Sequence, residues 1–244
     1  DQDYGGAITV DEPAAFTSVS RTISHVRGRA TDLASHAQTV AALEHLEQFN
    51  HATIQQLSLE HDRVFGHTIS SDCPPYETQY GAGIIFAQTQ RMGDITAFYR
   101  AFGVQLSPGA HERHDHIAAE LEFMSVLAFR EAAAIVENDP DHLADVRDAE
   151  RKFLVEHLAA WSLSFAERLG RKSRTATPPD GGFYAALAVC LDALVRDELR
   201  FIHVTPESLG HIEPGKIDFE PEGCSFACGP AGEPVLANLP GFEV

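Results

Sequence analysis

The sequence predicts an all-α fold, a single bundle of about eight to ten helices. Apolar residues recur every three or four positions along three long segments, which is the period of a helix. There is hardly any sustained alternation of apolar and polar residues, which would mark strands. Hydrophobic residues make up 44% of the 244 residues, enough for one sizeable core.

The boundaries of these three segments follow from capping and breaking residues. The first begins at a cap, either Asp115 or His114, and ends at the breaker 138–140. The second ends near Gly170, which suits a helix C-terminus, and the third follows the Pro/Gly stretch 177–182. Their apolar faces comprise, in order, Ile117, Leu121, Met124, Leu127 and Ala128; Phe153, His157, Leu158, Trp161 and Phe165; and Phe183, Leu187, Leu191, Leu194 and Val195.

The rest of the chain predicts two helical halves and a tail. Upstream, the sequence predicts one or two helices over residues 39–65 and another over 76–91. Asp94 is expected to cap a further helix that runs through Phe102. Ser107-Pro108-Gly109 lies in a stretch, about 104–114, that is either a domain boundary or a long surface loop between the halves. The predicted helical domain covers 1–201, with halves of about 14–103 and 115–201. Residues 202–244 hold six prolines and six glycines and predict an extended tail that wraps the bundle or is partly disordered.

Charge and composition limit the classes of partner. The formal net charge is −18, from 36 acidic and 18 basic residues, which repels phosphate backbones and argues against nucleic acid. The same charge attracts a cationic peptide, although it also serves solubility or a salty habitat. No apolar stretch approaches the roughly 20 residues of a membrane helix, so no stable membrane insertion is expected. With no export signal in the first ten residues and only four cysteines, we expect a cytoplasmic protein.

The densest polar cluster is His111-Glu112-Arg113-His114-Asp115-His116, followed by Glu120 and Glu122. Three interpretations are open. The cluster is a loop of solvated charges with Asp115 as a helix cap. Alternatively, His116 and Glu120, four residues apart, bind a cationic group or a metal on one helix face. The third is a nucleotide- or metal-dependent hydrolase that uses the residues from His111 to Glu120. No common catalytic motif is present, so the favoured expectation is that the chain is not an enzyme.

Two further segments carry polar or reactive side chains. After two prolines, Tyr76 and Tyr80 would share a helix face, either as core aromatics or as an exposed ledge, with Glu77 in the first turn. Cys224 and Cys228 are either two reduced thiols or part of a zinc site, a cluster or a regulatory disulfide. We expect Trp161 and His157, on an apolar face, to belong to the core.

An ordered set of motifs resembles the TorD-like chaperones of molybdenum-enzyme maturation, over residues of about 46–198. Its most specific part is the block D-H-I-x-x-E-L-E-F-M from Asp115. The resemblance implies that the two helical halves are joined by a hinge loop near His111 to His116, within the stretch of about 104–114. Where the family usually carries proline just before the Asp-His pair, this chain has Arg113-His114, which would alter this hinge. The motifs lie at 60–65, 74–80, 98–103, 115–127, 153–161 and 183–188.

The resemblance implies a cytoplasmic chaperone that binds the twin-arginine leader and the apo form of a molybdenum oxidoreductase catalytic subunit. Within the family, the chain most resembles the chaperones that serve type II enzymes of the dimethyl-sulfoxide-reductase class. The chaperone would hold this subunit until its cofactor is inserted, as a monomer or a homodimer without a cofactor of its own. It also implies transient contact with the client's molybdopterin guanine dinucleotide or a guanine nucleotide. Carboxylates would meet the arginines and aromatic residues would form the groove. The expected client-binding residues are Tyr76, Glu77, Tyr80, His114, Asp115, His116, Glu120 and Glu122.

Overall fold

The computed structural model describes residues 37–66, 72–81, 85–107, 109, 112–177, 182–210 and 212–215. Over these residues the chain is helical and contains no β-strand, which confirms the all-α class. The number of helices in the whole chain stays a prediction. The helices are α2 (Ala37–Glu47), α3 (Ile54–Phe65), α4 (Ile85–Ala101), α5 (Ile117–Glu137), α6 (Pro140–Phe153), α7 (Ala159–Ala176) and α8 (Gly182–Phe201). Three short turns are η1 (Glu77–Gln79), η2 (Leu154–Leu158) and η3 (Pro206–Leu209).

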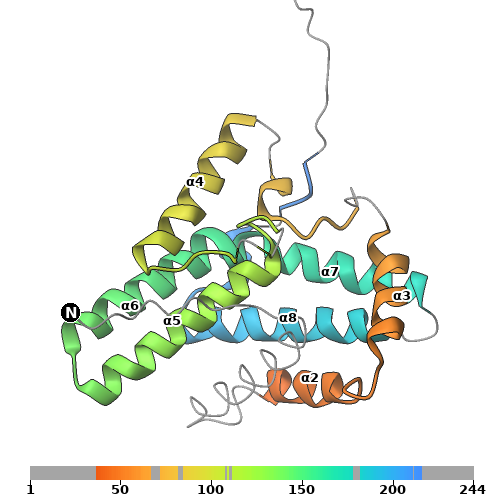
Figure 1. The fold of residues 1–244 in the computed structure, drawn as a ribbon, viewed down its shortest axis with the longest axis horizontal. Coiled ribbons are helices and arrows are strands. Elements are labelled where there is room, and N and C mark those ends of the chain that lie inside the picture. Colours follow the sequence, from red (N-terminus) through yellow and green to blue (C-terminus); the bar gives the residue numbers. More distant parts are fainter. Residues whose placement is uncertain are drawn as a thin grey trace, which may run out of the picture.

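The helices pack in pairs around the long α7 and α8 (Figure 1). α7 lies along α8, whose other side carries α2, and α3 crosses the ends of both. α5 and α6 form a hairpin, and α4 projects from the opposite side of this layer. None of the described helices is long and apolar enough to cross a membrane.

Local capping chemistry sets several helix ends. Thr53 and Gln56 form a reciprocal capping box at the start of α3. α5 ends where Asn138 adopts the left-handed conformation (φ 55°), and Asp139 caps α6 just before Pro140. The predicted break at 138–140 is therefore confirmed, and so is the start of α8 after the 177–182 stretch, at Gly182.

Three predicted boundaries are wrong. The cap of α5 is His116, whose Nδ1 accepts from the backbone N–H of Ala118, because the side chain of Asp115 turns inward instead. Asp94 lies inside the continuous helix α4, and Gly170 lies inside α7. Gly170 serves a close helix contact rather than a helix end, since a Cβ there would lie 3.5 Å from the Cβ of Ala188 on α8.

α6 and α7 are joined without a loop by the π-helical turn η2. A π turn inserts an extra residue into a helix and changes which side chains face the core. Leu154, His157 and Leu158 of this turn are buried, so His157 is a core histidine as expected. The buried Trp161, on the following turn, confirms the second core prediction.

One buried hydrophobic cluster contains residues from both predicted halves. Val64 and Tyr99 come from before the 104–114 stretch, and Phe123 and Phe153 from after it. The rings of Phe123 and Phe153 lie 4.7 Å apart in an edge-to-face contact, and Tyr99 lies 4.8 Å from Phe123. The described parts of the halves thus share a core, and the hinge between them stays a prediction.

The beginning of the predicted tail packs on the bundle. Ile202, Val204, Leu209 and Ile212 contact the main core. The backbone N–H of Gly215 donates to the carbonyl of Gln79 (2.8 Å), and that of Gly81 donates to the carbonyl of Glu213 (2.9 Å). These residues contain the 3₁₀ turn η3, and the extended character of the tail as a whole stays a prediction. The remainder, with Cys224 and Cys228, lies outside the described residues.

Truncation of Phe123 tests the shared core. Phe123→Ala removes a ring that is 1% exposed and contacts aromatic rings of α4 and α6. We expect a loss of about 3–5 kcal/mol in the free energy of unfolding, measured by urea denaturation. Val136→Ala, on the same helix but 85% exposed, should change it by less than about 0.5 kcal/mol. Equal effects of the two substitutions would contradict this core.

Candidate functional site around Asp115

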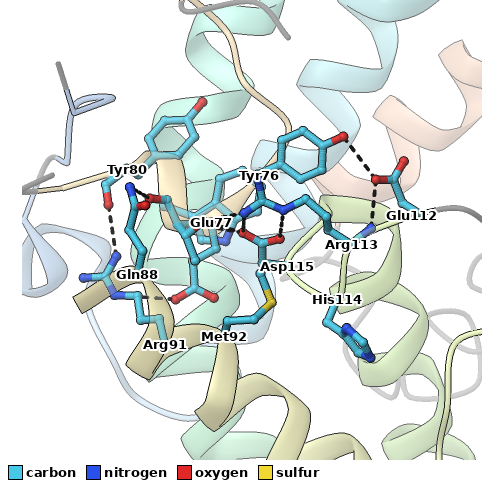
Figure 2. Close-up of polar contacts among 12 residues, drawn as sticks. Tyr76, Glu77, Tyr80, Gln88, Arg91, Met92, Glu112, Arg113, His114 and Asp115 are labelled. Atoms are coloured by element: carbon cyan, nitrogen blue, oxygen red, sulfur yellow. Dashed lines mark hydrogen bonds and ion pairs between the residues drawn. The ribbon is translucent and has the colours of Figure 1, made fainter. Parts of the chain in front are cut away.

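Two segments far apart in the sequence meet at the start of α5. The strand-like residues 75–77 lie antiparallel to 115–117, with an isolated bridge between Tyr76 and His116. The N–H of Glu77 donates to the carbonyl of Asp115 (2.9 Å), and the N–H of Ile117 donates to the carbonyl of Pro75 (3.0 Å). These backbone bonds place the side chains of both segments in one cluster (Figure 2).

The carboxylate of Asp115 is fully buried and has four donors. Oδ2 accepts from the backbone N–H of Thr78 (3.1 Å), from the Thr78 hydroxyl (2.7 Å) and from Nη2 of Arg113 (2.7 Å). Oδ1 accepts from Nε of Arg113 (2.9 Å). A buried carboxylate is tolerated when it is paired and hydrogen-bonded in this way. Asp115 therefore fastens residues 77–78 to the start of α5 and does not cap the helix.

Tyr76 forms the outer part of the cluster and is half-buried. Its hydroxyl donates to Oε1 of Glu112 (3.1 Å), and the guanidinium carbon of Arg113 lies 4.5 Å from its ring centroid. The imidazole of His116 meets the same ring edge-on at 5.3 Å. Burial, followed by the carboxylate of Glu112, raises the pKa of the Tyr76 hydroxyl.

Glu77 points into the bundle on the inner side of the cluster. It is 1% exposed, and both its carboxylate oxygens lie 3.2 Å from Nδ1 of His157. Nε of Arg91, on α4, lies 3.9 Å from Oε1, and Nη1 of the same guanidinium donates to the carbonyl of Tyr80 (3.0 Å). The π turn η2 is what brings His157 to Glu77, so this turn and the 72–81 segment are coupled.

Glu120 lies beneath Glu77 and is fully buried. Its Oε2 accepts from the indole N–H of Trp161 (3.0 Å), whereas Oε1 has no donor among the described residues. Burial first, and then the neighbouring charge of Glu77, raise the pKa of Glu120 well above its ordinary value. Glu120 is therefore protonated and neutral in the folded protein at pH values above its ordinary pKa.

The two predicted tyrosines do not share a helix face. Residues 77–79 form a single 3₁₀ turn, and α4 begins only at Ile85, so the predicted helix over 76–91 is wrong. Tyr80 is 2% exposed, stacks 5.1 Å from Trp161 and donates to the carbonyl of Pro74 (3.0 Å). Two prolines before Tyr76 and the buried contacts of Glu77 favour an extended segment over a helix.

The eight predicted site residues separate into two groups by exposure. Tyr76, His114, His116 and Glu122 are partly exposed. Glu77, Tyr80, Asp115 and Glu120 are buried and occupied with other residues of the chain. Their part in client binding stays a prediction, while their structural part is to hold the 72–81 segment in place. The sequence interpretation missed Thr78 and Arg113, and only the spacing of Arg113 from Asp115 hinted at their pairing.

The described residues contain no group of three side chains suited to hold a metal ion. His111, which the hydrolase hypothesis requires, lies outside them. Burial raises the pKa of the Cys73 thiol to about 12 and that of Cys190 to about 11. At neutral pH these two thiols are protonated, and a protonated thiol is a poor nucleophile.

Comparison with known proteins identifies the class. The family model described as nitrate reductase delta subunit matches residues 29–167, more than half of the chain and the whole of the cluster above. The chain therefore belongs to the nitrate reductase delta subunit family, which is TorD-like and matures redox enzymes. No solved structure matches the chain.

Curated relatives match a shorter part of the chain. The chlorate reductase assembly chaperone of Ideonella dechloratans is 40% identical over 76 residues, which are 31% of this chain and 38% of the relative. The selenate reductase assembly chaperone of Thauera selenatis is 41% identical over 76 residues, again 31% and 38%. The dimethyl sulfide dehydrogenase assembly chaperone of Rhodovulum sulfidophilum is 42% identical over 80 residues, 31% of each chain. The match thus spans about a third of the length of these relatives.

The raised pKa of Glu120 predicts a pH dependence of stability. The folded chain keeps a proton on Glu120 that the unfolded chain releases above its ordinary pKa of 4.5. This contribution to stability is complete below pH 4.5 and is lost as the pH rises toward the folded-state pKa, by at most about 1.4 kcal/mol per pH unit. Glu120→Gln has no such proton to lose, and its amide oxygen can still accept from the indole N–H of Trp161.

We therefore expect Glu120→Gln to gain stability relative to the wild type as the pH is raised from 4.5 toward 8 in urea-unfolding titrations. Glu167→Gln, on α7 with a side chain that is 63% exposed, is the matched control and should follow the wild type. A difference between Glu120→Gln and the wild type that does not change with pH would contradict a protonated Glu120.

Proposed function

We propose that this protein is a cytoplasmic assembly chaperone, not an enzyme, for the catalytic subunit of a molybdenum oxidoreductase. One observation carries the proposal: the chain belongs to the nitrate reductase delta subunit family, and the relatives that it matches are named as reductase or dehydrogenase assembly chaperones. The described residues offer no metal cluster that would favour the hydrolase alternative.

The proposed ligand is the arginine-containing leader of the client subunit, bound before export while the cofactor is inserted. The chemistry of the cluster around Asp115 supports this ligand. Carboxylates accept the forked N–H donors of a guanidinium, and an aromatic face binds the same group from above. At this cluster Glu112 is exposed and the ring of Tyr76 is partly exposed, and Glu122 is partly exposed on α5. The net charge of −18 favours the approach of a basic peptide.

We further propose a transient contact with the client's molybdopterin guanine dinucleotide or with a guanine nucleotide. This proposal is supported by family membership alone. The contacts described above join residues of this chain to one another and do not bear on a nucleotide. A client that is bound during cofactor insertion brings its cofactor close to the chaperone. Equilibrium dialysis with GTP would test this contact, and a lack of retention at millimolar GTP would contradict it.

Capture from the native host tests the function as a whole. The tagged protein is purified, and the retained proteins are identified by mass spectrometry. We expect a molybdenum oxidoreductase catalytic subunit whose leader is uncleaved. Retention of only the mature, cleaved subunit would contradict a role before export. A synthetic peptide of the captured leader should then bind in calorimetry with a Kd of about 1 μM or lower, about −8 kcal/mol.

A pair of carboxylate variants tests whether the side chain of Glu122 on α5 contributes to binding of the leader. Glu122→Gln removes a half-buried charge from α5, the helix that begins at the cluster, and we expect leader binding to weaken about threefold to tenfold. Glu167→Gln removes the same charge from the exposed face of α7 and should leave the Kd within about twofold. An equal loss in both variants would show that only the overall charge of the protein matters.

A further inference from the structure

The guanidinium of Arg113 occupies a site with the three features that best recognise this group. Asp115 accepts two of its N–H groups in a fork, the hydroxyl of Thr78 accepts another at 2.6 Å, and the ring of Tyr76 covers its face. We call Tyr76, Thr78 and Asp115 the guanidinium box. A planar forked cation fits this box, whereas the ammonium group of lysine has neither the shape nor the paired donors.

The box is assembled independently of its occupant. Asp115 is held by the backbone N–H and the hydroxyl of Thr78, and its own carbonyl accepts from the N–H of Glu77. The second backbone bond, from Ile117 to Pro75, closes the bridge. Tyr76 is fixed by its hydrogen bond to Glu112. None of these bonds involves the side chain of Arg113, so its withdrawal leaves the frame in place.

Exposure differs sharply between the box and its occupant. The side chain of Arg113 is 37% exposed, while that of Asp115 is 0% exposed. The guanidinium therefore covers the carboxylate from the solvent side and can leave without a rearrangement of the core. Once uncovered, the carboxylate has two fixed donors from Thr78 but no cation, and a second guanidinium restores the pair better than water or a neutral group does.

We propose that the guanidinium box is a binding site for an arginine of a partner polypeptide, and that Arg113 fills it in the unbound protein. The partner's arginine enters by exchange, in which one guanidinium replaces another on Asp115, Thr78 and Tyr76. The source of this arginine, a client leader, rests on the proposed function. The site itself rests on the geometry of the box. Arg113 thus lowers the apparent affinity for the partner by competing within the chain.

Chemical rescue tests the box without any client. Arg113→Ala lacks the part of the side chain that ethylguanidinium supplies. We expect millimolar ethylguanidinium to raise the melting temperature of Arg113→Ala by several degrees, and ethylammonium at equal concentration to have no such effect. The wild type and the double variant Arg113→Ala with Asp115→Asn should not respond. Equal responses of all three proteins, or none in Arg113→Ala, would overturn the site.

Arg113→Gln is used as a second variant in case Arg113→Ala does not fold, because the glutamine side chain keeps an N–H donor for Asp115. It is tested against the same two probes, with the same criteria. If Arg113→Ala folds only in the presence of ethylguanidinium, that result supports the site directly.

The leader peptide tests the exchange. By calorimetry, we expect Arg113→Ala to bind the captured leader about tenfold tighter than the wild type, because the internal competitor is gone. A leader peptide with lysine in place of arginine should lose this gain. Equal or weaker binding by Arg113→Ala would overturn the exchange. Failure of every variant to bind any leader would contradict the proposed function, and the ethylguanidinium experiment would still decide whether the box is a site.

Discussion

The structure around the start of α5 depends on one constraint: the carboxylate of Asp115 is buried and must be fully paired. An unpaired buried charge costs several kcal/mol, so the fold has to supply donors from outside α5. Thr78 supplies two of them, and to do so the 72–81 segment must lie antiparallel to residues 115–117. That arrangement in turn fixes Glu77 above His157 and Tyr80 against Trp161. Two hydrogen bonds from Thr78 to one buried carboxylate thus position an extended segment across the helices.

Acidic side chains continue from Asp115 into the interior, and the protein neutralises them by several means. Glu77 faces the imidazole of His157 and the guanidinium of Arg91. Among the described residues, Glu120 has the indole N–H of Trp161 as its donor, and burial keeps the carboxyl group protonated. Burying Glu120 near Glu77 is possible because the raised pKa of Glu120 keeps that group neutral. The π turn η2 belongs to this arrangement, since it turns His157 toward Glu77.

The sequence predicted the helix class, the major breaks and the core residues, because these follow from local period and capping chemistry. It failed where long-range contacts override local preference. The pattern at Tyr76 and Tyr80 fits a helix face, yet the buried pairing of Glu77 and Thr78 with residues 80 and 37 positions away holds the segment extended. Asp115 likewise resembles a helix cap, but an inward carboxylate with four donors is the more favourable state. Exposure cannot be read from residue type, so surface and core members of the site could not be separated.

Arg113 is a departure from the family's sequence pattern, and its contacts are visible only in the three-dimensional structure. Its position, just before the Asp-His pair, suggests a change in the backbone of a loop. The structure places its side chain on Tyr76, Thr78 and Asp115, which adds an electrostatic role that the sequence did not predict. In a chain of net charge −18, the carboxylate of Asp115 without this cover would attract any cation that approaches. A covalently attached guanidinium removes that general attraction and leaves a site that only a second forked cation can take. Selectivity for arginine then arises from the competition itself.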